Sequence, residues 1–127
     1  MTPYNVNPER FWEFLDRLLE SARVVIDRPA GSAHPRYPKV VYPLDYGYLA
    51  GTTGGDGREL DLWRGSLPEP VLDAVVCTVD LVKHDAEVKL LLGCNGEEKR
   101  VVMAFHNNSE FMAAMLLERL WGREGSG

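Results

Sequence analysis

The sequence predicts a single, mainly β domain with flanking helices, its strands arranged as a small closed or partly closed barrel. A chain of 127 residues with 45% hydrophobic content can bury one core but not two. Several short segments rich in apolar and β-branched residues alternate with Gly, Pro and Asn turns, which is typical of strands. Barrel closure removes the exposed edges that so many short strands would otherwise leave.

A helix over about residues 8–20 opens the domain of residues 1–127. Asn7 suits the N-cap of this helix, and Pro8 suits its first position. Apolar side chains then recur at helical spacing, namely Phe11, Phe14, Leu15, Leu18 and Leu19. The pattern indicates a helix packed against the barrel, which is predicted over about residues 22–105.

The first half of the barrel is predicted to contain strands at residues 23–27, 40–42, 46–49 and 60–63. Residues 28–38 are expected to form a loop, because they contain three prolines and a glycine, too many for a helix or a central strand. Residues 51–57, Gly-Thr-Thr-Gly-Gly-Asp-Gly, predict a tight loop, because glycine tolerates backbone angles that other residues avoid.

The second half is predicted to contain a three-strand meander over residues 72–82, 87–93 and 99–105. Asn95-Gly96 indicates a hairpin turn before the third strand. A C-terminal helix is expected over about residues 109–120, with Asn107 or Asn108 as its N-cap. Gly122 suits its end, and the tail to Gly127 is expected to fray.

The charge and hydropathy of the chain exclude some classes of function. A net charge of -5 argues against general nucleic-acid binding, which depends on contacts between cations and phosphate. No apolar run approaches the ~20 residues of a membrane span, and no secretory signal is visible, so a cytoplasmic protein is expected. Cys77 and Cys94 lack metal-ligand spacing and are predicted to be buried free thiols.

The segment from Tyr42 to Arg64 is dense in polar groups. Asp56 follows the glycines of the tight loop, and Asp61 lies on the next predicted strand. Together they could hold one hard cation, and ligation by oxygen alone favours Mg²⁺ or Mn²⁺ over zinc. The alternative is an ordinary turn, because Asp and Gly are also the residues of which turns are made.

Phosphate contacts are suggested by residues outside this acidic pair. Tyr46 offers a phenol donor, while His34, Arg36 and Lys39 form a basic cluster on the Pro-rich loop. Core packing of the tyrosine and a solvated loop are the alternatives. Glu87 and Lys89 are two residues apart on a strand and therefore share a face. His34 and His106 have no companion at metal-ligand spacing, so no zinc site is expected.

The sequence YPLDYGYLAGTTGGDGRELDLW, residues 42–63, resembles the signature region of the family I soluble inorganic pyrophosphatases. The earlier VVIDRPAGS and the later Glu87-Val88-Lys89 resemble two further strands of that family, so the resemblance covers residues 24–92. It implies an OB-like, five-stranded β-barrel of the inorganic pyrophosphatase type. It also implies Mg²⁺-dependent hydrolysis of pyrophosphate to phosphate by a metal-activated water.

The resemblance also implies roles for individual residues. Asp56 and Asp61 match the first and third acids of the signature, and Asp61 would be the central metal ligand. The other metal ligands would be Glu87 and Asp27. The phosphate-binding residues would be Tyr46, Lys89, and either His34 or Arg36 in place of the family's arginine.

Arg58 stands where the family has the second acid of its signature. An arginine stays protonated and cannot accept a proton from water, but it could bind phosphate. Three hypotheses follow. The chain is a compact pyrophosphatase with Asp85 or Glu59 as base, a hydrolase of another phosphoanhydride or phosphate ester, or an impaired relative that binds a phosphorylated ligand or a protein partner. A homo-oligomer, formed through an exposed apolar face near Trp12 or residues 112–115, is left open.

Overall fold

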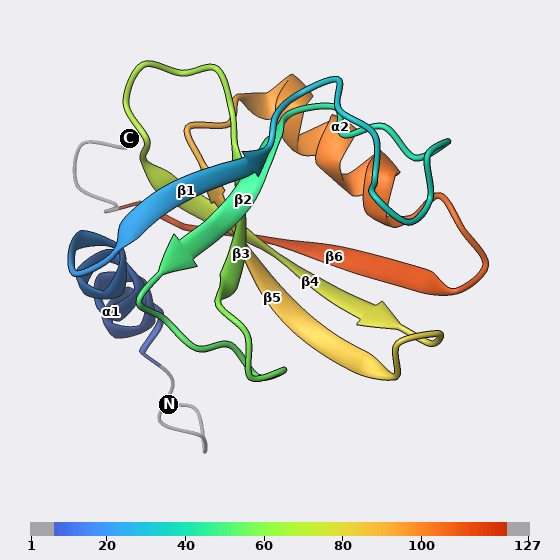
Figure 1. Ribbon diagram of the computed structural model, residues 1–127. Coiled ribbons are helices and arrows are strands. Elements are labelled where there is room, and N and C mark those ends of the chain that lie inside the picture. Colours follow the sequence, from blue (N-terminus) through green and yellow to red (C-terminus); the bar gives the residue numbers. More distant parts are fainter. Residues whose placement is uncertain (1–6, 122–127) are drawn as a thin grey trace.

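The computed structural model describes residues 7–121 and consists of one six-stranded sheet with two helices (Figure 1). In chain order the elements are α1 (Pro8–Glu20), β1 (Arg23–Arg28), β2 (Asp45–Ala50), β3 (Leu60–Arg64), β4 (Leu72–Asp80), β5 (Asp85–Leu92), α2 (Gly96–His106) and β6 (Met112–Glu118). The predicted fold class, mainly β with flanking helices, is confirmed. Neither helix of the described residues is long and apolar enough to cross a membrane.

The strands lie in the order β1-β2-β3-β5-β4-β6. Neighbours are antiparallel except for β3 and β5, which run parallel with Leu62 opposite Leu90. The sheet is open, because no ladder within residues 7–121 joins the edge strands β1 and β6. The strand predicted at residues 40–42 is reduced to a single bridge between Ala33 and Val41.

The two faces of the sheet bury two separate cores. Trp12 of α1 packs with one set of strand residues, which includes Leu62, Val75 and Leu90. Val102 of α2 packs with the set one residue further along each strand, namely Trp63, Val76 and Leu91. Because successive strand residues point to opposite faces, α1 and α2 cover opposite sides of the sheet.

Residues 99–105 are not a strand, as the sequence predicted, but part of helix α2. Asn95 does not open a hairpin; its side chain accepts the backbone N–H of Glu98 at 2.8 Å, and Glu98 accepts the N–H of Asn95 at 2.9 Å. This reciprocal capping box fixes the start of the helix. Val102 and His106, four residues apart, then face the core together.

The predicted C-terminal helix over residues 109–120 is also wrong, because residues 112–118 form the edge strand β6 beside β4. Asn107 is the C-cap of α2 rather than an N-cap. Its side-chain oxygen accepts the N–H of Ala114 at 2.9 Å and so blocks the outer edge of β6. Pairing with β4 thus overrides the helical preference of a segment rich in Ala, Met and Leu. The predicted helix stop at Gly122 and the tail to Gly127 lie outside the described residues.

Candidate functional site

A buried lysine is the centre of the candidate site. Lys89 is only 5% exposed, and its ammonium group donates to Tyr46 Oη at 2.9 Å, Asp61 Oδ2 at 3.0 Å and Glu87 Oε2 at 3.3 Å. Tyr46 in turn donates its hydroxyl proton to Asp61 Oδ2 at 2.7 Å. All three ammonium protons are therefore used, which is the condition under which a lysine is tolerated inside a protein.

The strand register brings these four side chains together. Tyr48 of β2 lies opposite Asp61 of β3, which places Tyr46 diagonally across from Asp61 on the same face. The parallel pair Leu62 and Leu90 places the residues one step earlier, Asp61 and Lys89, side by side on the α2 face. Glu87 shares this face because it precedes Lys89 by two residues.

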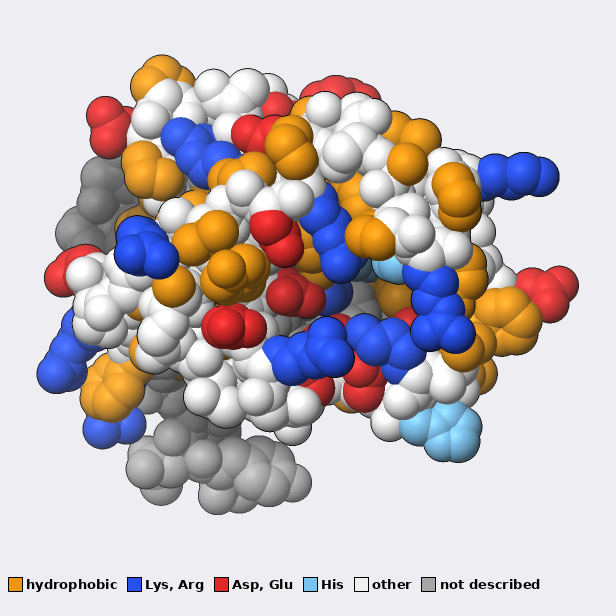
Figure 2. Space-filling model, viewed as in Figure 1, with side chains coloured by type: hydrophobic (Ala, Val, Ile, Leu, Met, Phe, Trp, Pro, Cys, Tyr) orange, Lys and Arg blue, Asp and Glu red, His pale blue; other side chains and the backbone are white. Residues whose placement is uncertain are grey.

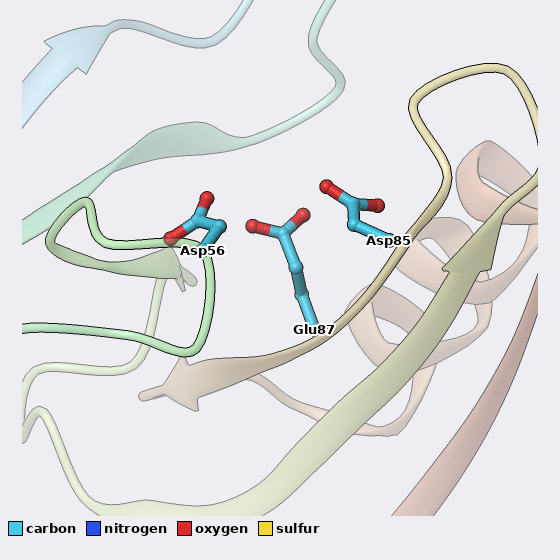
Figure 3. A group of neighbouring side chains, drawn as sticks. All are labelled: Asp56, Asp85 and Glu87. Atoms are coloured by element: carbon cyan, nitrogen blue, oxygen red, sulfur yellow. The ribbon is translucent and has the colours of Figure 1, made fainter.

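A group of three carboxylates adjoins the lysine. Ligand oxygens of Asp56, Asp85 and Glu87 lie within 4.8 Å of one another, and Figure 3 shows their side chains converging from the glycine loop and from β5. Gly57, with φ of 84°, turns the loop, and Asp56 Oδ1 accepts the N–H of Arg58 at 3.0 Å. The glycine loop thereby holds Asp56 in position beside Glu87.

Burial and a hydrogen bond between Glu87 and Asp56 give these two carboxyl groups different pKa values. Burial raises the pKa of Glu87, and the hydrogen bond to Asp56 adds to this against the charge of Lys89. The N–H of Arg58 lowers the pKa of Asp56. The two carboxyl groups thus differ in acidity, because the pKa of Glu87 is raised while that of Asp56 is lowered. Burial, with the charge of Asp61, also keeps the pKa of Tyr46 well above its usual value, so Tyr46 remains a neutral donor.

Cations border the carboxylates on the other side. Lys83, in the turn between β4 and β5, has its ammonium group 3.6 Å from Asp85 and 3.9 Å from Glu87. The pKa of His34 is lowered by burial and then by the charges of Arg28, Lys83 and Arg36, which all lie within electrostatic range. Figure 2 shows Lys and Arg side chains next to Asp and Glu side chains around a hollow in the middle of this face. The site thus combines a place for a cation with a place for an anion.

The structure brings together six of the residues predicted from the sequence, namely Tyr46, Asp56, Asp61, Asp85, Glu87 and Lys89. Asp27 is exposed on β1, where the register with β2 is irregular, and does not belong to the carboxylate group. Arg58 is exposed and contacts Asp56 through its backbone. Asp27 therefore lies outside this carboxylate group, and its role as a metal ligand stays a prediction.

The predicted basic residues of the Pro-rich loop lie at the border of the site. His34 is half-buried, and its Nδ1 accepts the N–H of Arg36 at 3.0 Å and of Tyr37 at 3.2 Å. The guanidinium group of Arg36 is exposed and lies 5.9 Å from the ring centre of Tyr37. His34 therefore shapes the loop, while the guanidinium group of Arg36 remains exposed to solvent.

Sequence reasoning missed Arg28 and Tyr42. Arg28 Nη1 donates to the hydroxyl of buried Tyr42, and the guanidinium group lies 5.4 Å from the centre of that ring. Arg28 is also the register partner of Tyr46. The only local signal was the position of Arg28, directly after a predicted strand and before a proline. Its partner Tyr42 lies 14 residues further along the chain, so the contact could not be predicted.

Sequence reasoning also missed the role of His106, which contacts Trp63, the residue that packs against Tyr46. His106 Nε2 accepts the indole N–H of Trp63 at 3.0 Å, and the Trp63 ring lies edge-on to Tyr46 with centroids 4.7 Å apart. Burial lowers the pKa of His106 to about 4, so the ring is neutral at pH 7. With its Nε2 occupied by Trp63, His106 has a packing role.

No family model and no curated protein matches the sequence, whereas solved structures do match. An inorganic pyrophosphatase from Neisseria gonorrhoeae gives a TM-score of 0.61 at 17% identity, over 75% of this chain and 80% of that chain. One from Coxiella burnetii gives 0.57 at 14% identity, over 75% and 84%. An inorganic phosphatase from Anaplasma phagocytophilum gives 0.51 at 14%, over 75% and 81%. This chain has a pyrophosphatase-like fold.

The carboxylates of this pyrophosphatase-like fold fit a hard divalent cation. Their donors are carboxylate oxygens alone, the ligands that Mg²⁺ and Mn²⁺ prefer. Asp85 Oδ1 is buried and has no hydrogen-bond partner among the described residues. A buried carboxylate oxygen without a partner is costly, and a cation or a water molecule at this place would remove that cost.

Proposed function

We propose that the protein is a Mg²⁺-dependent hydrolase of pyrophosphate or a related phosphoanhydride. The observation that carries the proposal is the convergence of Asp56, Asp85 and Glu87 within 4.8 Å, next to the buried Lys89 and Asp61. The pyrophosphatase-like fold agrees with it, although fold alone does not carry function.

The residues divide into three roles. Asp56, Asp61 and Glu87 hold the cation, which when bound neutralises phosphate charge and lowers the pKa of a water molecule. Arg28 and Lys83 bind the phosphate oxygens, and Arg36 and Arg58 reach the same anion from the rim. Tyr46, held neutral by burial, is positioned to donate to phosphate in place of Asp61.

Asp85 is the general base in this proposal. Its Oδ1 lacks a hydrogen-bond partner within the described chain, and the carboxylate faces the same space as Glu87. It can therefore accept the proton of the attacking water at that atom. Arg58 cannot do so, because a guanidinium group stays protonated. Removing a general base costs about 10²–10⁴ in rate, which sets the expected effect of Asp85→Asn.

The second candidate is a protein that binds a phosphorylated ligand without hydrolysing it. Two features favour this alternative, because both reduce the number of acids around the cation. Arg58 stands at the position of a signature acid, and Asp27 is not part of the carboxylate group. Binding would then depend on Arg28, Lys83 and Arg36.

The test is phosphate release from pyrophosphate by the purified protein, with Mg²⁺ and then Mn²⁺. We expect turnover by the natural sequence, and its loss in Asp61→Asn and Asp85→Asn. Glu97→Gln, at an exposed acid of α2, is the matched control and should keep full activity. Pyrophosphate binding measured by calorimetry without turnover would support the second candidate. A chain that neither binds nor hydrolyses pyrophosphate would contradict both.

Arg58→Asp tests whether the chain has lost its general base or has it at another residue. If Arg58 has replaced a base that this chain needs, the substitution should raise phosphate release from pyrophosphate. If Asp85 is the base, the same substitution should leave the rate unchanged or lower it, because it removes a cation near the anion.

A further inference from the structure

The face of the sheet on the α1 side is covered over only half its length. Trp12, Leu15 and Leu19 of α1 pack over the start of β4 and the end of β5. Further along, Val79 of β4 and Val88 of β5 point to the same face, because alternate strand residues share a face. Both are exposed, Val79 by 50%. Figure 1 shows α1 near one end of these long strands, while their joined ends extend away from it.

The uncovered half forms an open, apolar groove of about 680 Å³. Its floor consists of alternate small and apolar residues of three neighbouring strands, namely Cys77, Val79, Ala86, Val88, Ala113 and Met115. Met115, on edge strand β6, is 73% exposed. The glycine loop forms one wall of the groove and places Asp56 and Glu59 at its border, where Asp61 and Glu87 of the candidate site also line it. A contiguous apolar surface with a polar border marks an interaction site.

The outer side of α1 has the opposite character. Phe11, Phe14 and Leu18 are spaced as i, i+3 and i+7, so they form one stripe that points away from the protein's own core. Phe14 is 48% exposed. The guanidinium groups of Arg10 and Arg17 lie 4.4 Å and 5.2 Å from the Phe14 ring centre. The helix thus presents an apolar stripe bordered by cations.

We propose that the chain forms a symmetric dimer in which α1 of each copy occupies the groove of the other. On this face α1 protrudes from the sheet by the thickness of a helix, while the strands of the groove beside it are uncovered. A two-fold axis that passes between α1 and the groove places α1 of each copy over the groove of the other copy. The same contact is therefore made twice. The apolar stripe meets the apolar floor, and Arg10 and Arg17 approach the border formed by Asp56 and Glu59.

Closure favours this dimer over an open chain of copies. α1 has 13 residues and is therefore about 20 Å long, which allows one helix to run along one groove. A single contact of this kind is small beside the ~1,200–2,000 Å² of stable interfaces. The two-fold arrangement doubles the buried area without ordering any further part of the chain.

Sedimentation of the full chain tests the assembly. We expect a mass twice the 14.3 kDa of the chain, falling on dilution. Phe14→Glu, on the helix, and Met115→Glu, in the groove, should each raise the dissociation constant roughly 10-fold or more. Leu67→Glu, at another exposed apolar residue, in the loop between β3 and β4, should not. Far-UV circular dichroism should show that all three variants remain folded, because each site is exposed in a single copy.

Cross-linking tests the arrangement itself. Cys77 lies exposed in the groove, whereas Cys94 is buried with its pKa raised to about 12 and is unreactive. Under oxidation by diamide, Phe14→Cys should form a disulfide-linked dimer between position 14 and Cys77 of the partner subunit, identified by peptide mapping. Leu67→Cys should not. The proposal is overturned by a natural chain that stays monomeric at every concentration, by a dimer indifferent to both Glu variants, or by cross-links that join only Cys77 to Cys77.

Discussion

The ammonium group of Lys89 lies 3.0 Å from Oδ2 of Asp61 and joins strands β5 and β3 on the α2 side of the sheet. Replacing it with an apolar side chain of similar length leaves Asp61, Glu87 and the Tyr46 hydroxyl without their shared donor. We expect Lys89→Met to lower the free energy of unfolding by about 1–3 kcal/mol, measured by urea denaturation at pH 7. Lys89→Arg, which keeps the charge, should cost less. Equal stability of Lys89→Met and the natural chain would contradict the structure.

The free energy of unfolding should fall as the pH is lowered, because His106 is buried in its neutral form. Burial lowers its folded pKa to about 4, below the usual 6.5, so the neutral ring stabilises the fold above pH 6.5. As the pH falls from 6.5 towards 4, the unfolded chain takes up the proton first, and about 3 kcal/mol is lost. Denaturation at a series of pH values should show this slope. His106→Gln, which still accepts from Trp63, should flatten it, and an unchanged slope would exclude His106 as its origin.

His84 has a positive φ of 57°, in the turn between β4 and β5. This left-handed conformation costs an L-residue about 1 kcal/mol, and glycine avoids that cost. We expect His84→Gly to raise the midpoint of thermal unfolding. His84→Ala removes the same side chain but keeps the strain, so it should give no such gain; a gain of equal size there would indicate a cause other than backbone strain.

The capping box of α2 predicts an asymmetry between two asparagines. Asn95→Ala removes the acceptor of the Glu98 N–H and should cost about 1 kcal/mol of stability. Asn108→Ala, at an exposed position after the helix, should cost almost nothing. Chemical denaturation of the two variants distinguishes the helix from the hairpin that Asn95-Gly96 would otherwise form. Similar losses in both would argue against the cap.

Local sequence patterns predicted the first five strands because each contains a short run of apolar or aromatic residues beside polar or turn residues. They also predicted a strand at residues 40–42, which the structure reduces to a single bridge, and they failed again after residue 94. The sequence Asn95-Gly96-Glu97-Glu98 is compatible with both a hairpin turn and a helical capping box. The reciprocal hydrogen bonds between Asn95 and Glu98 in the structure show that it forms the capping box. Residues 112–118 prefer a helix in isolation, and only the neighbouring strand β4 makes them a strand.

The same distinction applies to the site. Glu87 and Lys89 share a face by strand periodicity, so their pairing could be predicted from the sequence. Asp85 was predicted beside them, and the turn places it there. The contacts of Arg28 with Tyr42 and of Trp63 with His106 join residues 14 and 43 positions apart. No local pattern contains such contacts, because they depend on how the loop folds back and on where α2 lies.

The raised pKa of Glu87 has a consequence for how the site binds a cation under the proposed function. A divalent cation binds the ionised form of Glu87 and Asp56, and the surroundings that raise the pKa of Glu87 favour its protonated form, so cation and proton compete for the same oxygens. Loading is therefore an exchange rather than a simple addition. The affinity for the cation therefore rises as the pH rises. Cation concentration and pH together decide whether this pair of side chains holds a cation or a proton.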